Sequence, residues 1–444
     1  SAGRNKVSLS IFIKSSLPFG TPSMEDNAAL KFLEEQIGAN LNMEIYEQIY
    51  EDKIRVKIAS GEIPDVFEWG GVDDFIIPMI ESGAIVPFEP YIDEYENLAA
   101  QKHLYTTQYQ GKIYPIPDVR NPIASPDIPL IRQDWLDHLN LKAPETTDEL
   151  YDVAVAFTKN DPDNNGKHDT YGIQIAGNNL DGTWGIKMAF GVNKIWMKDG
   201  DKVIPYFASE GYKQYLAFMQ KLFQAGAIDP DFAVTDHILA QNKVVVEGKA
   251  GIFMHYTPRV YEFEDGLKKS NPNAKLVGFK AVKGPNGDRG VRARVNGGGA
   301  YLSKTAAEDP EKLKAIMKWL DFGASKEGGI FRDFGVEGIH HTVNNDGTRN
   351  TDQKLIEKDS PWALINTAPI QDTNDVYIDK KKSEESQNIV REAHKMNEPY
   401  IVFDETKQLF SPTYASVTTE AEQFVLDKEI QAIMGQIKVE DWDA

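Results

Sequence analysis

Val7-Ser-Leu-Ser-Ile-Phe-Ile13 opens a run of alternating strand and helix patterns that decides the fold. Apolar residues recur at helical spacing over 26–37, and residues 41–45 are again strand-like. A second helical pattern (51–60) then precedes a third strand (65–69). Repeated β-α-β units build a parallel sheet covered by helices, with ligands at the carboxyl ends of the strands. The sequence therefore predicts an α/β protein.

The rest of the chain also contains both strand and helix patterns. A second α/β region begins near Leu130, and Ala250-Gly-Ile-Phe-Met-His-Tyr256 has the pattern of a buried strand. A helix is expected over 310–323. With 444 residues, of which 41% are apolar, the chain is long enough for two domains with cores of their own.

Charge and cysteine content exclude several classes of protein. There are 68 acidic and 48 basic residues, so the net charge of -20 repels nucleic acid and anionic membranes. The absence of cysteine excludes disulfides, zinc-thiolate sites and thiol catalysis. No apolar run approaches the roughly 20 residues of a membrane-spanning helix. The polar start, Ser1-Ala-Gly-Arg-Asn-Lys6, is typical of an exported protein whose signal peptide has been removed.

The loop Asp161-Pro-Asp-Asn-Asn-Gly-Lys-His-Asp169 predicts a structural calcium site, because oxygen side chains alternate around one glycine as in an EF-hand loop. The expected ligands are the side chains of Asp161, Asp163, Asn165 and Asp169 and the carbonyl of Lys167. Gly172 stands where a complete EF-hand has a bidentate glutamate, so the loop is not a sensor. The alternative is a turn-rich surface loop that binds nothing.

Six segments in order along the chain form a recognisable set: Ala59-Ser-Gly-Glu-Ile-Pro-Asp-Val66, Gly111-Lys-Ile-Tyr-Pro-Ile-Pro117, Ile131-Arg-Gln-Asp-Trp-Leu136 with Leu139-Asn-Leu141, the Asp161 loop, Gly248-Lys-Ala-Gly-Ile-Phe253 and Gly335-Val-Glu-Gly-Ile-His340. Together they resemble the extracellular solute-binding proteins of ABC importers. The resemblance is to the large carbohydrate-binding branch, which includes lipoproteins of Gram-positive bacteria and calcium-containing alginate oligosaccharide binders. In this family a glutamate usually follows the last loop aspartate, and Thr170 takes its place here as the remaining candidate metal ligand.

The resemblance implies a periplasmic-binding-protein fold, in which two hinge-linked α/β lobes close on a ligand in the cleft between them. Residues 118–122 and 292–299 are the expected crossovers, the second containing three consecutive glycines. The N-lobe is then predicted as 1–121 plus 296–340, and the C-lobe as 122–295 plus 341–444.

The resemblance also implies an oligosaccharide ligand. Sugar sites combine aromatic platforms with polar groups that orient hydroxyls. The aromatic candidates are Trp69, Trp184, Tyr256 and Trp362. The polar candidates are Asp118, Arg120, Asn179, Asp181, Arg292, Arg294, Asn296 and Glu337. For each residue the alternative is structural: a core aromatic, a turn residue or an ion pair.

The expected protein is a monomeric receptor without catalytic residues. It delivers an oligosaccharide to transmembrane permease subunits, either lipid-anchored at the extracellular face of the membrane or in the periplasm. Two alternatives stay open: a glycosidase that uses a carboxylate pair, and a receptor for a non-sugar solute. Nucleophile elbows, phosphate loops, zinc helices and dinucleotide fingerprints are absent from the sequence.

Overall fold

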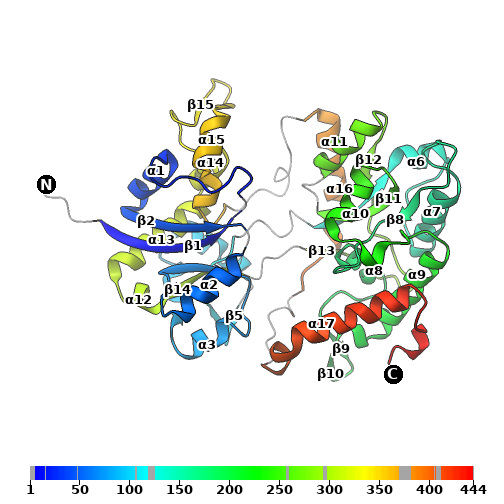
Figure 1. Cartoon of the computed structure of the whole chain (residues 1–444), viewed down its shortest axis with the longest axis horizontal. Coiled ribbons are helices and arrows are strands. Elements are labelled where there is room, and N and C mark those ends of the chain that lie inside the picture. The colour runs from blue at the N-terminus through cyan, green and yellow to red at the C-terminus, as the bar shows by residue number, and fades with distance from the viewer. Residues whose placement is uncertain are drawn as a thin grey trace. The chain divides into compact units, whose positions relative to one another are not determined.

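The computed structural model describes residues 6–15, 17–47, 49–105, 108–118, 126–256, 260–293, 298–369, 382–404, 406 and 412–443. The chain forms two compact units, each assembled from stretches that are discontinuous in sequence (Figure 1). Unit 1 comprises residues 1–120, 296–370 and 410–415, and unit 2 comprises residues 121–295, 371–409 and 416–444. No helix in these described ranges is both long enough and apolar enough to cross a membrane.

Unit 1 is built on a five-stranded sheet in the order β2-β1-β3-β14-β4. The strands are β1 (Val7–Lys14), β2 (Ala39–Tyr46), β3 (Val66–Trp69), β4 (Ile85–Val86) and β14 (Gly299–Ser303). β1 pairs in parallel with β2 and β3, whereas β14 is antiparallel to β3 and β4. The predicted β-α-β units at the start of the chain are therefore confirmed.

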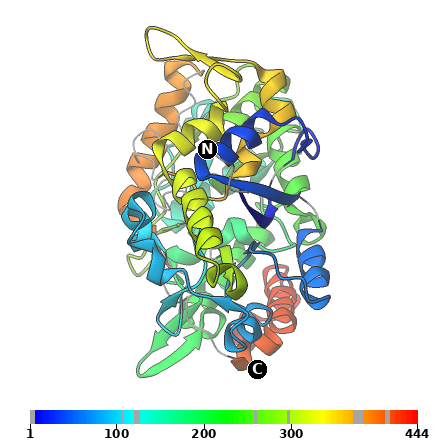
Figure 2. The same cartoon turned by 90° about the vertical axis from the view of Figure 1, so that its left-hand side faces the viewer.

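Helices cover both faces of this sheet, because successive side chains of a strand point to opposite faces. On β1, Leu9, Ile11 and Ile13 join one apolar cluster with α1 (Ala28–Ile37) and α13 (Pro310–Ala324). Figure 2 shows α13 in yellow-green across this unit. Phe12, between them in sequence, joins a second cluster with α2 (Tyr50–Ala59) and α3 (Ile76–Glu81). The short elements α4 (Glu89–Ile92), α5 (Glu96–Gln101), β5 (Gln108–Tyr109), β6 (Lys112–Ile113) and α12 (Lys304–Ala307) complete this part of the unit.

Residues 341–370 belong to unit 1, which corrects their predicted place in the C-lobe. This stretch holds the hairpin β15 (His341–Val343) and β16 (Arg349–Thr351), α15 (Gln353–Asp359) and a 3-10 turn, η7 (Pro361–Leu364), and it follows α14 (Lys326–Phe334). Asp359 accepts a hydrogen bond from Ala28 N at 2.9 Å, and Asn27 Nδ2 donates to its carbonyl at 2.8 Å. Trp319 Nε1 donates to Leu364 O at 3.0 Å. These buried contacts fasten the stretch to α1 and α13.

Unit 2 is built on a four-stranded sheet in the order β12-β7-β11-β8. The strands are β7 (Asp127–Arg132), β8 (Tyr171–Ile173), β11 (Ala250–Tyr256) and β12 (Leu276–Gly278). β11 is antiparallel to β7 and parallel to β8. Gly251 lets β11 lie against helix residues, because a Cβ there would be 2.1 Å from the Phe157 ring. The expected second α/β region and its buried strand are therefore confirmed.

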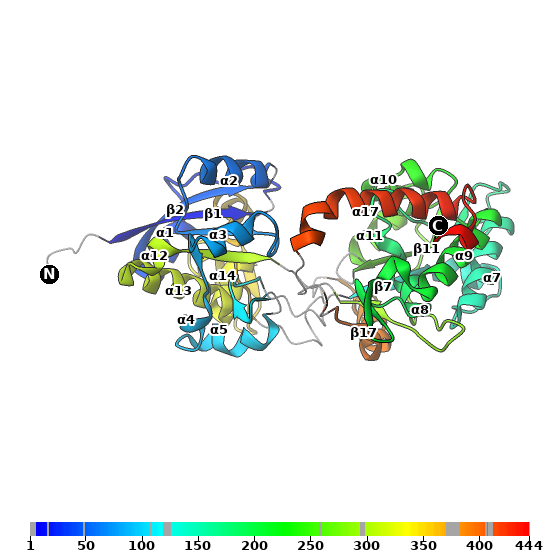
Figure 3. The ribbon, with the colours of Figure 1, turned by 90° about the horizontal axis from the view of Figure 1, so that it is seen from below.

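The helices of unit 2 include a long C-terminal one. They are α6 (Gln133–His138), α7 (Thr147–Lys159), α8 (Trp184–Ala189), α9 (Glu210–Gln224), α10 (His237–Val245), α11 (Val260–Ser270), α16 (Glu384–Asn397) and, from residue 416 onward, α17 (Pro412–Ile433). Two small sheets pair β9 (Trp196–Asp199) with β10 (Lys202–Pro205) and β13 (Val291–Arg292) with β17 (Ile401–Val402). α17, red in Figure 3, packs on α8 and α9 through its buried Glu429. Glu429 pairs with Lys187 Nζ at 3.0 Å and accepts a hydrogen bond from Tyr215 at 2.8 Å.

Candidate functional site

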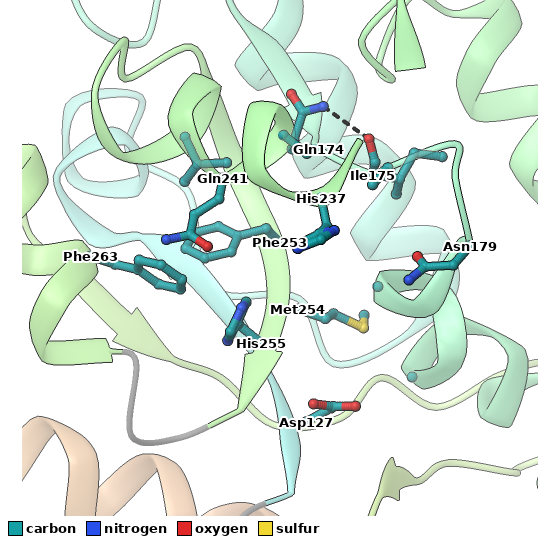
Figure 4. A pocket seen from close by; sticks show the side chains of 15 residues that line it. Asp127, Gln174, Ile175, Asn179, His237, Gln241, Phe253, Met254, His255 and Phe263 are labelled. Atoms are coloured by element: carbon teal, nitrogen blue, oxygen red, sulfur yellow. Dashed lines mark hydrogen bonds between the residues drawn. The ribbon is translucent and has the colours of Figure 1, made fainter. Parts of the chain in front are cut away.

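A cavity of about 320 Å³ lies in unit 2, where β8 and β11 end and β7 begins (Figure 4). Because β8 and β11 are parallel, their carboxyl ends reach the same edge of the sheet, which is where α/β sheets bind ligands. The volume is at the lower end of the range for small-molecule sites. Position and size therefore make this cavity the candidate functional site of unit 2.

Polar and apolar side chains share the lining of this cavity. The polar ones are Asp127, Gln174, Asn179, His237, Gln241 and His255, and the larger apolar ones are Ile175, Phe253, Met254 and Phe263. His237 and Gln241 lie four residues apart on α10, so they share one face of that helix. His255 meets the Phe263 ring edge-on, with 4.8 Å between ring centroids. Amide, imidazole and carboxylate groups beside apolar surface are suited to a ligand with hydroxyls and C–H faces.

Gln174 directly follows β8, and hydrogen bonds to Ile175 and Asp229 fix its side chain. Its Nε2 donates to Ile175 O at 3.0 Å and to Asp229 Oδ2 at 3.1 Å. Lys243 Nζ donates to the same Asp229 oxygen at 2.6 Å, which balances the charge of this fully buried carboxylate. Gln174 Oε1 is buried and has no hydrogen-bond partner among the described residues. An unsatisfied amide at a cavity wall is costly, which is typical of functional sites.

The predicted residue Arg292 reaches the cavity edge through Asp127. Its Nε and Nη2 donate to Asp127 Oδ2 at 3.0 and 2.8 Å. Its guanidinium also lies 5.6 Å from the centre of the Trp184 ring, within the range of a cation–π contact. Trp184, at the start of α8, packs against Tyr206 with 5.6 Å between ring centroids. The structure thus brings Asn179, Trp184 and Arg292 to one region of unit 2, although only Asn179 of the three lines the cavity.

Trp69 occupies the core of unit 1. Only 7% of its surface is exposed, and its Nε1 donates to Asp73 Oδ2 at 2.8 Å. The ring packs against Phe75, with centroids 4.4 Å apart, and under the Arg55 guanidinium at 4.8 Å. This burial favours the structural alternative over the predicted sugar platform.

Glu68, which was not predicted, forms a polar cluster at the ends of β1 and β3. Its Oε2 accepts from Lys14 N at 2.5 Å, and its Oε1 accepts from Asn366 Nδ2. Burial raises the pKa of Glu68 to about 7; the two hydrogen bonds oppose that shift, and the nearby Asp118 charge adds to it. The predicted residue Asp118 is half-buried and lies 3.5 Å from Arg332 Nη1. In the sequence, Glu68 stands inside a strand between Phe67 and Trp69, and this position gave little sign of a polar cluster.

The other predicted ligand residues are not brought together. Trp362 is half-buried in η7, where its ring meets Phe19 edge-on at 6.4 Å, and Glu337 is exposed after α14. Arg120, Arg294 and Asn296 lie outside the described residues. For Asp181 and Tyr256 only the backbone is described, and it places them in a 3-10 turn, η3 (Asp181–Thr183), and at the end of β11.

The predicted calcium loop folds around its own carboxylates. Asp161 accepts hydrogen bonds from Asn165 N and Gly166 N at 3.0 and 2.9 Å. Asn165 Nδ2 donates to Asp163 at 2.8 Å and to Asp169 at 3.2 Å, so all four predicted side-chain ligands form one group. The Lys167 N–H donates to Asn165 Oδ1 at 2.8 Å.

The charges of this loop are incompletely balanced. Burial and the neighbouring Asp161 and Asp169 raise the pKa of Asp163, and Asp163 Oδ1 is buried with no hydrogen-bond partner in the described chain. A hydrogen bond from Lys249 holds the pKa of Asp169 below its usual value. The residues therefore fit a hard cation in type and charge.

Two observations limit this fit. Thr170 Oγ1 donates to Phe157 O at 2.8 Å, so the hydroxyl is directed at α7 and not into the predicted ligand group. Within the described ranges, no set of three or more His, Asp or Glu side chains stands ready to hold a metal ion. The loop carboxylates would have to draw together around one, with the Asn165 amide turning its oxygen inward.

Comparison with known proteins identifies the family. The family model for bacterial extracellular solute-binding proteins matches residues 42–330, and the chain belongs to this family. Proteins of this family are substrate-binding components of ABC importers and are not themselves enzymes. The resemblance seen in the sequence is thus confirmed.

Two relatives from Bacillus subtilis match over nearly the whole chain. Lipoprotein LipO is 28% identical over 438 residues, and the polygalacturonan/rhamnogalacturonan-binding protein YtcQ is 27% identical over 429; each match covers 94% of this chain and 85% of the relative.

Solved structures share the fold. The Streptococcus pneumoniae substrate-binding protein FusA in complex with kestose has a TM-score of 0.70 at 20% identity, covering 98% of this chain and 94% of FusA. Alginate-binding protein AlgQ2 without calcium ion has a TM-score of 0.69 at 20% identity, covering 99% and 94%. The two-lobed solute-binding-protein fold expected from the sequence is therefore confirmed.

Proposed function

We propose that this protein is the oligosaccharide receptor of an ABC importer and that it releases its ligand unchanged. The observation that carries the proposal is the unit 2 cavity, where amide, imidazole and carboxylate groups lie beside Met254 and Phe263 at the carboxyl ends of parallel strands. Sugars need this combination, because their hydroxyls must be paired and their C–H faces packed.

The relatives support an oligosaccharide over another solute. YtcQ is named for binding polygalacturonan and rhamnogalacturonan, and the FusA structure contains kestose. The relative LipO is named a lipoprotein, which supports a lipid-anchored protein at the extracellular face of the membrane. We propose that it acts there as a monomer beside its permease.

The glycosidase alternative gains no support from the cavity. Retaining and inverting glycosidases both require two carboxyl groups that flank the scissile bond. Asp127 is the only carboxylate among the described residues that line the cavity, and Arg292 already engages it.

We further propose that the Asp161 loop binds calcium as a structural ion. The support is the unpaired Asp163 oxygen among three carboxylates, whose mutual repulsion a divalent cation would relieve. Such an ion would link the end of α7 to the start of β8, whereas the cavity residue Gln174 follows the other end of β8.

A thermal-shift panel tests the receptor proposal. The protein is melted with neutral and acidic oligosaccharides, with matched monosaccharides and with short peptides, because a ligand that binds only the folded state raises the melting temperature. We expect oligosaccharides to raise it and peptides to leave it unchanged. A shift with peptides alone would establish a non-sugar receptor, and a shortened sugar after incubation would establish an enzyme.

A further inference from the structure

Among the described residues that line the unit 2 cavity, the charged side chain is an acid and none is a lysine or an arginine. The charged side chain in the lining is Asp127, with 8% of its side chain exposed. Figure 4 shows its carboxylate at the end of the cavity below Met254.

Two described basic side chains beside the lining, Arg292 and Lys243, are engaged in ion pairs. Both Nε and Nη2 of Arg292 bind the same Asp127 oxygen, and the guanidinium is stacked near Trp184. Lys243 is bound to the buried Asp229 behind Gln174. Among the described lining residues, a ligand carboxylate would thus meet the Asp127 carboxylate, amides and the imidazoles of His237 and His255, with no lysine or arginine to replace its lost hydration.

We propose that this cavity takes an uncharged sugar residue and discriminates against a uronate, and that the Asp127–Arg292 ion pair is the determinant. This inference rests on the proposed oligosaccharide receptor. Asp127 acts in two ways. Its charge repels a ligand carboxylate, and its hydrogen bonds with Arg292 Nε and Nη2 keep these two donors from binding the ligand carboxylate instead. The same carboxylate can accept hydrogen bonds from sugar hydroxyls.

The pair has a matched counterpart at the other end of the same strand. Arg132, the last residue of β7, donates through Nε and Nη2 to Asp134 at 2.8 and 2.6 Å and lies 4.7 Å from the Trp135 ring centre. It reproduces the chemistry of the Asp127–Arg292 pair but does not line the cavity. Asp134→Asn is therefore the control for Asp127→Asn.

The first experiment compares ligands on the unaltered protein. Affinities are measured by calorimetry at about pH 8, to limit imidazolium charge, for trimers of glucose, galactose and mannose, for kestose, and for the corresponding uronic-acid trimers. We expect a neutral trimer to bind at least about tenfold more tightly than its uronate counterpart. Uronates that bind as tightly as neutral trimers would overturn this inference and leave the receptor proposal standing. If no sugar binds, both fall.

The second experiment alters the determinant. Asp127→Asn should gain at least about tenfold in uronate affinity relative to neutral trimers, because it removes one negative charge and the charged partner of Arg292 Nε and Nη2. Arg292→Gln should change the ratio in the opposite direction, since it removes the positive charge that is paired with Asp127. Asp134→Asn should keep the ratio of the unaltered protein. A folded Asp127→Asn variant without the gain would overturn the role of the pair; should that variant not fold, an unchanged ratio in Arg292→Gln would do so.

Discussion

Replacement of Glu68 by glutamine should make unit 1 more stable at alkaline pH. The carboxyl group lies among the Lys14 N–H, the Asn366 amide and the Asp118 charge, and burial raises its pKa to about 7 from its ordinary value of 4.5. The folded state therefore holds this proton more tightly than the unfolded state. Its stabilising effect is complete below about pH 4.5 and is lost as the pH rises through 7.

The magnitude follows from that difference in pKa. The rise of about 2.5 in the pKa of Glu68 corresponds to at most about 3.4 kcal/mol, and partial access of water to this carboxyl reduces the expected effect to roughly 1–2 kcal/mol. The amide introduced by Glu68→Gln cannot ionise. It can also donate to Asn366 Oδ1, which has no hydrogen-bond partner among the described residues, once the Asn366 amide turns over.

Urea unfolding at about pH 5 and pH 8 measures the effect. Glu68→Gln should match the unaltered protein at the lower pH and exceed it at the higher pH. Glu51→Gln is the control, because the Lys14 ammonium lowers the pKa of the exposed Glu51, so its contribution is lost on acidification instead. Parallel pH profiles for Glu68→Gln and the unaltered protein would refute the reasoning.

Three further outcomes are expected. Trp69→Ala should destabilise unit 1 by about 3–5 kcal/mol in urea unfolding, because the ring is buried in the core. A stable variant with weakened sugar binding would instead support Trp69 as a sugar-stacking residue. Gln174→Met should weaken sugar binding at least about fivefold by calorimetry. The control is Gln101→Met, which replaces another buried glutamine whose Oε1 has no described partner and should leave binding unchanged. Equal losses in the two variants would show that Gln174 is not part of the site. Chelator should lower the melting temperature of the unaltered protein but not that of Asp163→Asn. In chelator, Asp163→Asn should melt at a higher temperature than the unaltered protein, because it removes one of the repelling carboxylates. An unaltered protein whose melting temperature does not respond to chelator, and which contains no metal by elemental analysis, would exclude calcium.

The local pattern of the first 70 residues was sufficient to predict the sheet of unit 1. Strand and helix periods alternate there without interruption, and helix ends are marked, as where Gly38 adopts a φ of 75° after α1. The placement of residues 341–370 could not be predicted in this way. It depends on Asp359 and Leu364 meeting α1 and α13, contacts that span up to 331 residues of sequence.

The site was predicted only in part, for a similar reason. Arg292 was predicted from its place on the second expected crossover and Asn179 as a polar partner for sugar hydroxyls, and their contacts with a ligand stay predictions. Gln174, His237 and His255 come together only because a strand end, a helix start and a neighbouring strand converge. Trp69 shows that residue type alone does not identify a ligand-binding aromatic. Glu68 and Trp69 both lie at the end of the four-residue strand β3, and the sequence does not say which of the two side chains enters the core.

The most direct test of the receptor proposal is to titrate the protein with the oligosaccharide that stabilises it most and then to recover the sugar. Calorimetry gives the stoichiometry and affinity, and mass spectrometry of the released sugar gives its length. The account predicts saturable binding of one oligosaccharide per chain and a released sugar of unchanged mass. Shortened products, or heat changes that never saturate across the panel, would contradict it.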